Sequence, residues 1–120
     1  MEKRKVKVTI ISEETKQEYT TIGNYDEEKE ILTYQEKQDI VTDVVLYLKE
    51  NILIRNNKDL NMKYLFLLNK ETTNTIYLKE LDKNIDIKIK ITKYNYDNNN
   101  LEIEYILIDS GDKVNYKIKY

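Results

Sequence analysis

The chain has 120 residues, with 20 Lys plus Arg against 22 Asp plus Glu, and it contains no His, Cys, Pro or Trp. Without His and Cys there can be no Ser-His-Asp or Cys-His nucleophile, no imidazole or thiolate metal site and no disulfide. Only two glycines, Gly23 and Gly111, are present, so a glycine-rich phosphate-binding loop is excluded as well. We therefore predict a protein with no cofactor and no bound metal.

The length predicts a single domain over residues 1–120, large enough for a core without covalent staples. The N-terminal basic residues are not followed by the apolar region of a secretory signal, and no apolar run approaches the length of a membrane span. A formal net charge of −2 is unlike the basic excess of most nucleic-acid-binding domains. We expect a cytoplasmic location, with neither a membrane nor a nucleic acid as a partner.

Residue types that suit a pleated sheet dominate the chain, and clusters of turn-forming residues interrupt them at regular intervals. This rhythm is typical of an all-β sandwich or barrel made of short strands with tight connections. In chain order the expected turns fall at residues 13–16, 24–28, 37–39, 50–51, 56–59, 69–74, 82–84, 97–100 and 109–112.

The first expected strand places Val6, Val8 and Ile10 on one face. Residues 40–50 fit either a strand or a helix with Asp39 as its N-cap, and their β-branched content favours the strand. The runs 44–48 and 64–68 are apolar on both faces, which predicts that a partner subunit, a helix or a ligand covers both sides.

Alternation of apolar and polar residues is cleanest in the last third of the chain. A tight turn at Ser110-Gly111 would place Tyr105 opposite Tyr116 and Glu104 opposite Lys117. It would likewise set Ile103 against Ile118 and Glu102 against Lys119. A hairpin centred near Tyr96 would set Glu102 and Glu104 beside Lys90 and Lys88, which predicts a strand of carboxylates between two strands of lysines.

About 8–10 strands joined by tight connections predict an antiparallel up-and-down barrel, because closure removes the edges of a flat sheet. Whether the first strand pairs with the last is not visible in local patterns.

With the strands in this order, the chain resembles the YwiB-like family of small bacterial proteins of unknown function, which has a calycin-type, lipocalin-like barrel. The segment LEIEYILIDSGDKV at residues 101–114 is similar to the last hairpin of the family, and LTYQE at residues 32–36 to its Tyr-x-Tyr-x-Glu strand. Residues 53–56 are similar to its Ile-Arg-x-Gly strand end, without the glycine. The resemblance implies a calycin-like barrel fold.

Two departures from this pattern limit what the resemblance implies. Residues 80–83 replace a Thr-Pro-Tyr-Gly turn, and the Gly-x-Trp signature of lipocalins is absent, so ligand binding does not follow from the lipocalin likeness.

Arg55 is the only arginine outside the N-terminal tail, although lysine is abundant. Its planar fork would suit a carboxylate, and if it turns inward, Glu36 and Tyr34 are the partners we expect. The alternative is an arginine at the barrel rim that donates to backbone carbonyls.

The eleven tyrosines either line a cavity for an amphipathic ligand or are explained by cross-strand packing. With Arg55 and Glu36, the candidate ligand-binding tyrosines are Tyr34, Tyr47, Tyr64 and Tyr77. No catalytic residue is predicted, because the adjacent carboxylate pairs, Glu13-Glu14 and Glu27-Glu28, lie in turn clusters.

The sequence thus favours a non-enzymatic barrel that binds a small, partly apolar ligand or a peptide in or at the barrel mouth. The alternative is a structural or protein-interaction module with a packed interior, which forms a homodimer through its two-sided strands.

Overall fold

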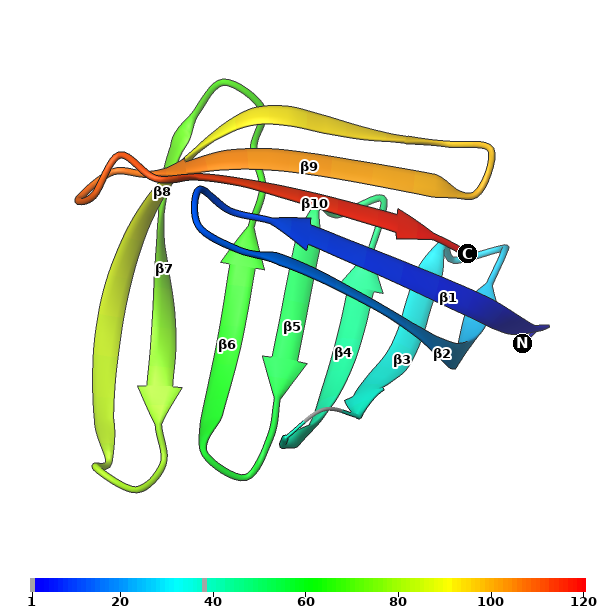
Figure 1. Cartoon of the computed structure of the whole chain (residues 1–120), viewed down its shortest axis with the longest axis horizontal. Coiled ribbons are helices and arrows are strands. Elements are labelled where there is room, and N and C mark those ends of the chain that lie inside the picture. Colours follow the sequence, from blue (N-terminus) through cyan, green and yellow to red (C-terminus); the bar gives the residue numbers. More distant parts are fainter. Residues whose placement is uncertain (1, 38) are drawn as a thin grey trace.

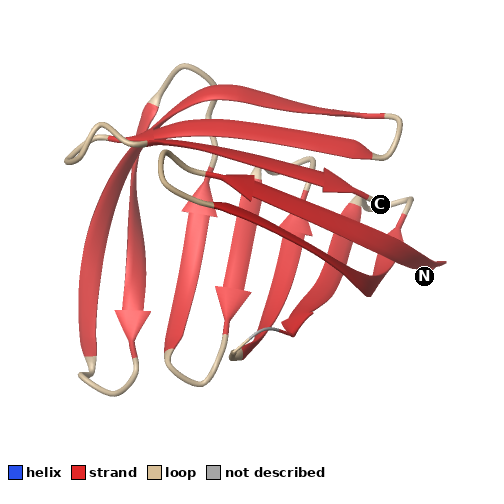
Figure 2. Ribbon diagram, viewed as in Figure 1, coloured by secondary structure: helices blue, strands red, loops and turns tan. Residues whose placement is uncertain are grey.

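The computed structural model describes residues 2–37 and 39–120, which form strands and turns (Figures 1 and 2). The ten strands are β1 (Glu2–Ile11), β2 (Lys16–Asp26), β3 (Ile31–Lys37), β4 (Val41–Tyr47), β5 (Ile52–Asn56), β6 (Leu60–Leu65), β7 (Glu71–Leu78), β8 (Lys83–Asp97), β9 (Asn100–Leu107) and β10 (Lys113–Lys119). Residues 40–50 thus contain a strand, as their β-branched residues favour, and not the alternative helix.

The sheet closes into a barrel with the order β1-β10-β9-β8-β7-β6-β5-β4-β3-β2. Every neighbouring pair of strands is antiparallel, and β1 pairs with both β2 and β10, for example through Val8 opposite Ile118. This pairing of the first and last strands closes the circle. The prediction of an all-β, antiparallel up-and-down barrel is confirmed.

The connections between strands coincide with the predicted turn clusters to within a few residues, and the middle of the predicted turn at 37–39 lies outside the described residues. Most of the described non-glycine residues with a positive φ are Asn or Asp, which tolerate the left-handed region better than other side chains; the full set is Glu30, Asn51, Asn69, Asp82, Asn98 and Asn99. The last two form the two-residue turn between β8 and β9, with φ values of 49° and 63° that fit a type I′ turn.

The predicted register of the last hairpin is wrong by two residues. Val114 lies opposite Tyr105, and Tyr116 lies opposite Ile103. The reason is a longer loop, because the backbone N–H of Leu107 donates to the carbonyl of Asp112 at 2.8 Å and Gly111 adopts a φ of 76°. A shift of two residues keeps each side chain on its predicted face, since the pleat has a period of two.

The predicted centre of the preceding hairpin, near Tyr96, is also wrong, because the turn lies at Asn98-Asn99. Glu104 therefore lies opposite Lys93, past a register shift between Ile91 and Lys93. The carboxylates of β9 still lie between lysines of β8 and β10, although the ion pairs differ from those predicted. The observed pairs are Lys93–Glu102 at 3.6 Å, Lys113–Glu104 at 3.6 Å and Lys117–Glu102 at 3.9 Å.

Strands β3 to β7 form one wall of the barrel, and β9, β10, β1 and the first part of β2 cross it at a steep angle (Figure 1). The long strand β8 belongs to both walls, since its first part pairs with β7 and its second part with β9. A continuous cluster of buried side chains fills the space between the walls, with Val6, Leu32, Phe66, Ile103 and Ile118 among its members.

Aromatic side chains pack densely near the end of the barrel that carries the β4–β5 and β6–β7 connections. Phe66 stacks on Tyr94 with ring centroids 6.2 Å apart, and the Tyr94 hydroxyl donates to the carbonyl of Leu48 at 3.0 Å. The Tyr96 hydroxyl donates to a carboxylate oxygen of Glu30 at 3.1 Å. We call this the aromatic end, and the opposite end, where β3 and β5 terminate, the mouth.

Candidate functional site

Five polar side chains from four strands converge near the mouth of the barrel, and we call them the polar cluster: Tyr19 of β2, Tyr34 and Glu36 of β3, Arg55 of β5 and Tyr116 of β10. Their positions follow from the pleat, because Tyr34 and Glu36 share the inward face of β3 with Leu32, and Arg55 shares the inward face of β5 with Leu53. Because side chains alternate between the two faces of each strand, the charged and phenolic groups of these strands all point into the barrel near its mouth.

Arg55 and Glu36 form an ion pair inside the wall of the barrel. The Nη2 atom of Arg55 lies 2.9 Å from Oε1 and 2.7 Å from Oε2 of Glu36. Glu36 is 6% exposed, whereas the Arg55 side chain is 27% exposed and reaches the mouth. The predicted contact between the two is confirmed, and the carboxylate that the guanidinium holds belongs to the chain itself. Among the described residues, no backbone carbonyl accepts from Arg55.

One buried donor of the guanidinium takes no part in the ion pair. The Nε atom of Arg55 is buried without a hydrogen-bond partner. Burial on its own would lower the pKa of Arg55, but Glu36, Tyr116 and Tyr19 together outweigh this effect and raise the pKa above its ordinary value. The guanidinium therefore stays charged at any physiological pH.

The tyrosine hydroxyl groups extend this polar region. The hydroxyl oxygens of Tyr34 and Tyr116 lie 3.3 Å apart, whereas the hydroxyl of Tyr19 is buried without a partner. Burial raises the pKa of Tyr19, Tyr34 and Tyr116 above the ordinary value, so all three remain neutral donors and acceptors at physiological pH.

Tyr64 and Tyr105 bring apolar surface to the polar cluster. Their rings meet edge to face with centroids 6.2 Å apart, and Tyr64 also meets the ring of Phe66 at 5.9 Å. Burial raises the pKa of Tyr64, while the charge of Arg55 acts in the opposite direction. The result is a boundary between an apolar interior and a polar mouth that still holds two unpaired donors.

Tyr47 and Tyr77, the other two predicted site residues, do not join the cluster. Tyr47 shares the outward face of β4 with Val45, and Tyr77 borders a groove on the outer wall, where its hydroxyl donates to Asp82 at 2.5 Å. Four of the predicted six residues thus lie on the inward face, Arg55, Glu36, Tyr34 and Tyr64.

Tyr19 is the member of the polar cluster that sequence reasoning missed. Its spacing with Thr21, Gly23 and Tyr25 places it on an inward face, and this period-two pattern was the available signal.

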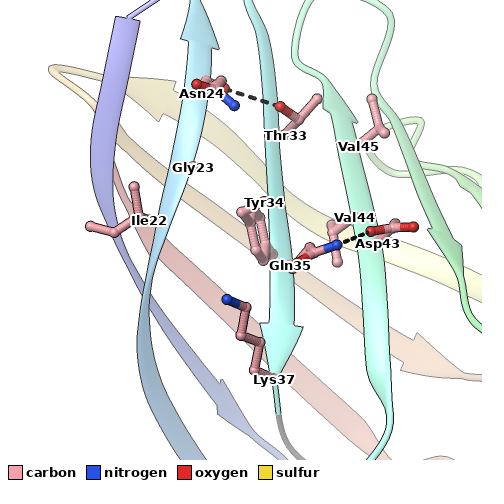
Figure 3. A pocket seen from close by; sticks show the side chains of 10 residues that line it. All are labelled: Ile22, Gly23, Asn24, Thr33, Tyr34, Gln35, Lys37, Asp43, Val44 and Val45. Atoms are coloured by element: carbon pink, nitrogen blue, oxygen red, sulfur yellow. Dashed lines mark hydrogen bonds between the residues drawn. The ribbon is translucent and has the colours of Figure 1, made fainter.

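The described chain also carries grooves on its outer wall. One of about 440 Å³ runs across β2, β3 and β4, where Ile22, Gly23, Thr33, Gln35 and Lys37 border it (Figure 3). At its far side the Gln35 amide donates to the Asp43 carboxylate at 2.8 Å. Among the described residues we find neither a group of side chains suited to a metal ion nor a helix able to cross a membrane.

Comparison with known proteins bears on the fold alone. No protein-family model and no curated protein sequence matches the chain. Among solved structures, the crystal structure of YwiB from Bacillus subtilis is similar, with a TM-score of 0.58 and 15% sequence identity over 98% of this chain and 89% of that one. The predicted likeness to YwiB is thereby confirmed at the level of architecture, and the chain has a YwiB-like fold.

Proposed function

We propose that this chain is a non-enzymatic, calycin-like binding barrel that takes a small, partly apolar ligand at its mouth. The observation that carries the proposal is a group of buried polar atoms of the polar cluster without hydrogen-bond partners: Arg55 Nε–H and the Tyr19 hydroxyl, which lies beside the hydroxyls of Tyr34 and Tyr116, as donors, and Glu36 Oε2 as an acceptor. Buried polar groups in folded proteins are nearly always hydrogen-bonded, so these atoms near the mouth favour a polar ligand group that supplies an acceptor.

The charge balance of the site narrows the chemistry of this ligand. Glu36 already neutralises Arg55 at 2.7 Å, so a second carboxylate would face a like charge. An uncharged acceptor such as a carbonyl, an ether or a hydroxyl suits the two donors better. The rings of Tyr64 and Tyr105 favour an apolar body behind it.

The experiment uses prodan, a neutral naphthyl ketone whose emission shifts to the blue in apolar surroundings. We expect binding to the wild-type protein and a loss of about three- to tenfold in affinity for Tyr19→Phe, the range for one hydrogen bond. Tyr77→Phe removes a hydroxyl from the outer wall and is the matched control. Equal affinities of the two variants, or no shift with the wild type, would refute the proposal.

Substitution of Arg55 by Lys tests the guanidinium directly. Lysine keeps the charge but has no Nε–H, so prodan affinity should fall. An unchanged affinity with a lower melting temperature would instead indicate a purely structural arginine. Native mass spectrometry of the protein from its own host tests whether a natural ligand co-purifies.

A second candidate function rests on the outer wall. Outward-facing Ile31, Tyr47, Ile52 and Leu65 lie opposite one another across β3 to β6 and form an apolar row. Such a row favours a homodimer or a docking module, in line with the two-sided strands predicted from the sequence. Light scattering at increasing concentration tests it, and Ile52→Asp should shift a dimer to a monomer.

A further inference from the structure

Strands β2 and β3 pair over only a short distance. The register between them covers Gly23–Asp26 with Ile31–Tyr34. By contrast, β2 pairs with β1 from Lys16 to Tyr25, and β3 pairs with β4 along its whole length. Figure 3 shows the two strands moving apart beyond Gly23. We call the stretch where residues 16–22 and 35–37 face each other without a ladder the seam.

Gly23 fixes the point at which the seam begins. A Cβ atom at this position would lie 2.5 Å from the carbonyl oxygen of Thr33 and 3.0 Å from side-chain atoms of Tyr34 and Val6. The two strands therefore touch most closely at a residue without a side chain, and the seam opens directly after it.

The other short pairing in the barrel is handled differently. Strands β6 and β7 pair only over Leu60–Met62 with Ile76–Leu78. Beyond it, the Asn74 side chain accepts from the Leu65 N–H at 2.8 Å, and the Thr72 hydroxyl donates to the Leu65 carbonyl at 3.0 Å. Side chains thus satisfy that gap, whereas no side-chain hydrogen bond of the described residues joins 16–22 to 35–37 across the seam, although Tyr19 lies beside Tyr34.

Both faces of the seam offer contacts to an additional strand. On the outside, Ile22 is 65% exposed beside the groove across β2 to β4. On the inside, Tyr19 and Glu36 lie on its two flanking strands, and the Tyr19 hydroxyl and Arg55 Nε are unpartnered. Successive side chains of a strand in the seam would therefore face, in alternation, an exterior that offers Ile22 beside polar groups and a polar interior.

We propose that the seam accepts an extended peptide from a partner protein by strand addition, with an Asn or Gln side chain directed inward. The amide oxygen would accept from Tyr19 or Arg55, and its NH₂ group would donate to Glu36. A second copy of the barrel does not suit this site, because β3 already flanks the free edge of β2 and would block the approach of a whole sheet.

The test is hydrogen exchange with a short synthetic peptide that alternates valine with polar residues around a central glutamine. Strand addition should protect backbone amides within residues 16–22 and 35–37, and alternate N-methylation of the peptide should abolish this protection. Protection elsewhere, for instance on the outward rows of β4 and β5, or no protection at all, would overturn the proposal.

A pair of variants separates this inference from small-ligand binding at the mouth. Ile22→Asp should weaken the peptide about tenfold, because it removes exposed apolar surface that the strand would cover. Leu81→Asp, at a position 67% exposed on a distant turn, should have no effect. Ile22→Asp leaves Tyr19 and Arg55 intact, so prodan binding should persist, and the two proposals can fail independently.

Discussion

Removing one member of the Glu36–Arg55 pair should cost far more stability than removing the other. Arg55→Met leaves a carboxylate that is 6% exposed without its counter-ion, and Glu36→Leu leaves a guanidinium that is 27% exposed and can turn to water. Unpairing a buried charge costs about 3–5 kcal/mol. We expect about 3 kcal/mol for Arg55→Met and about 1 kcal/mol for Glu36→Leu, because solvent screens the remaining arginine.

The double variant Glu36→Leu/Arg55→Met should be nearly as stable as Glu36→Leu alone. Apolar replacement of both charges leaves no unpaired ion in the barrel, so we expect a cost of about 1 kcal/mol and a coupling energy of about 3 kcal/mol. Urea unfolding followed by far-UV circular dichroism measures all four proteins. Lys63→Met, an exposed change on the neighbouring strand β6, is the control for loss of a positive charge. Equal costs of the two single variants, or a double variant that is as unstable as Arg55→Met alone, would refute this reasoning.

Three further predictions concern other parts of the barrel. Burial raises the pKa of Tyr116 in the folded state, so its contribution to the free energy of unfolding is fully present below the unfolded pKa of about 10 and decreases at higher pH. Tyr116→Phe should reduce the decrease in the free energy of unfolding by up to about 1.4 kcal/mol per pH unit, as measured by urea unfolding from about pH 9 upward. An unchanged slope would contradict the assignment. Gly23→Ala should lower the free energy of unfolding by about 2–3 kcal/mol, because the added Cβ atom would clash with β3. Gly111→Ala should cost only about 1 kcal/mol, because the φ of 76° is its one source of strain. Equal decreases in melting temperature for the two variants would argue against the close contact at Gly23. Asn74→Ala should cost about 1–3 kcal/mol, because the Leu65 N–H loses its acceptor, and hydrogen exchange at that amide should accelerate.

Part of the candidate site was visible in the sequence. Arg55 stands out in a chain that otherwise uses lysine, and the alternation around Tyr34 and Glu36 placed both on one face. The sequence left two interpretations of Arg55 open, an inward contact with Glu36 or Tyr34 and a rim arginine that donates to backbone carbonyls, and the structure shows the contact with Glu36. The sequence did not show that Tyr47 and Tyr77 lie on the outward face, because the abundance of tyrosine gives no information on which face of a strand each occupies.

Local patterns determined the elements of this protein. Period-two alternation and clusters of Asn, Asp and Gly define strands and turns, because both are local properties of the backbone. These local patterns support two predictions, the all-β barrel and the choice of which residues of β8 to β10 face inward. The register of the last hairpins did not follow, since loop length and the irregularity between Ile91 and Lys93 decide it.

Closure of the barrel and the set of residues that meet at its mouth depend on contacts between distant strands. Val8 pairs with Ile118 across nearly the whole chain, and no local pattern encodes a contact between segments so far apart. The same long-range pairing brings Tyr19 of β2 and Tyr116 of β10 beside the ion pair between β3 and β5. Local alternation therefore indicated the inward face of β3 and of β8 to β10, whereas closure of the barrel brings the inward residues of distant strands together.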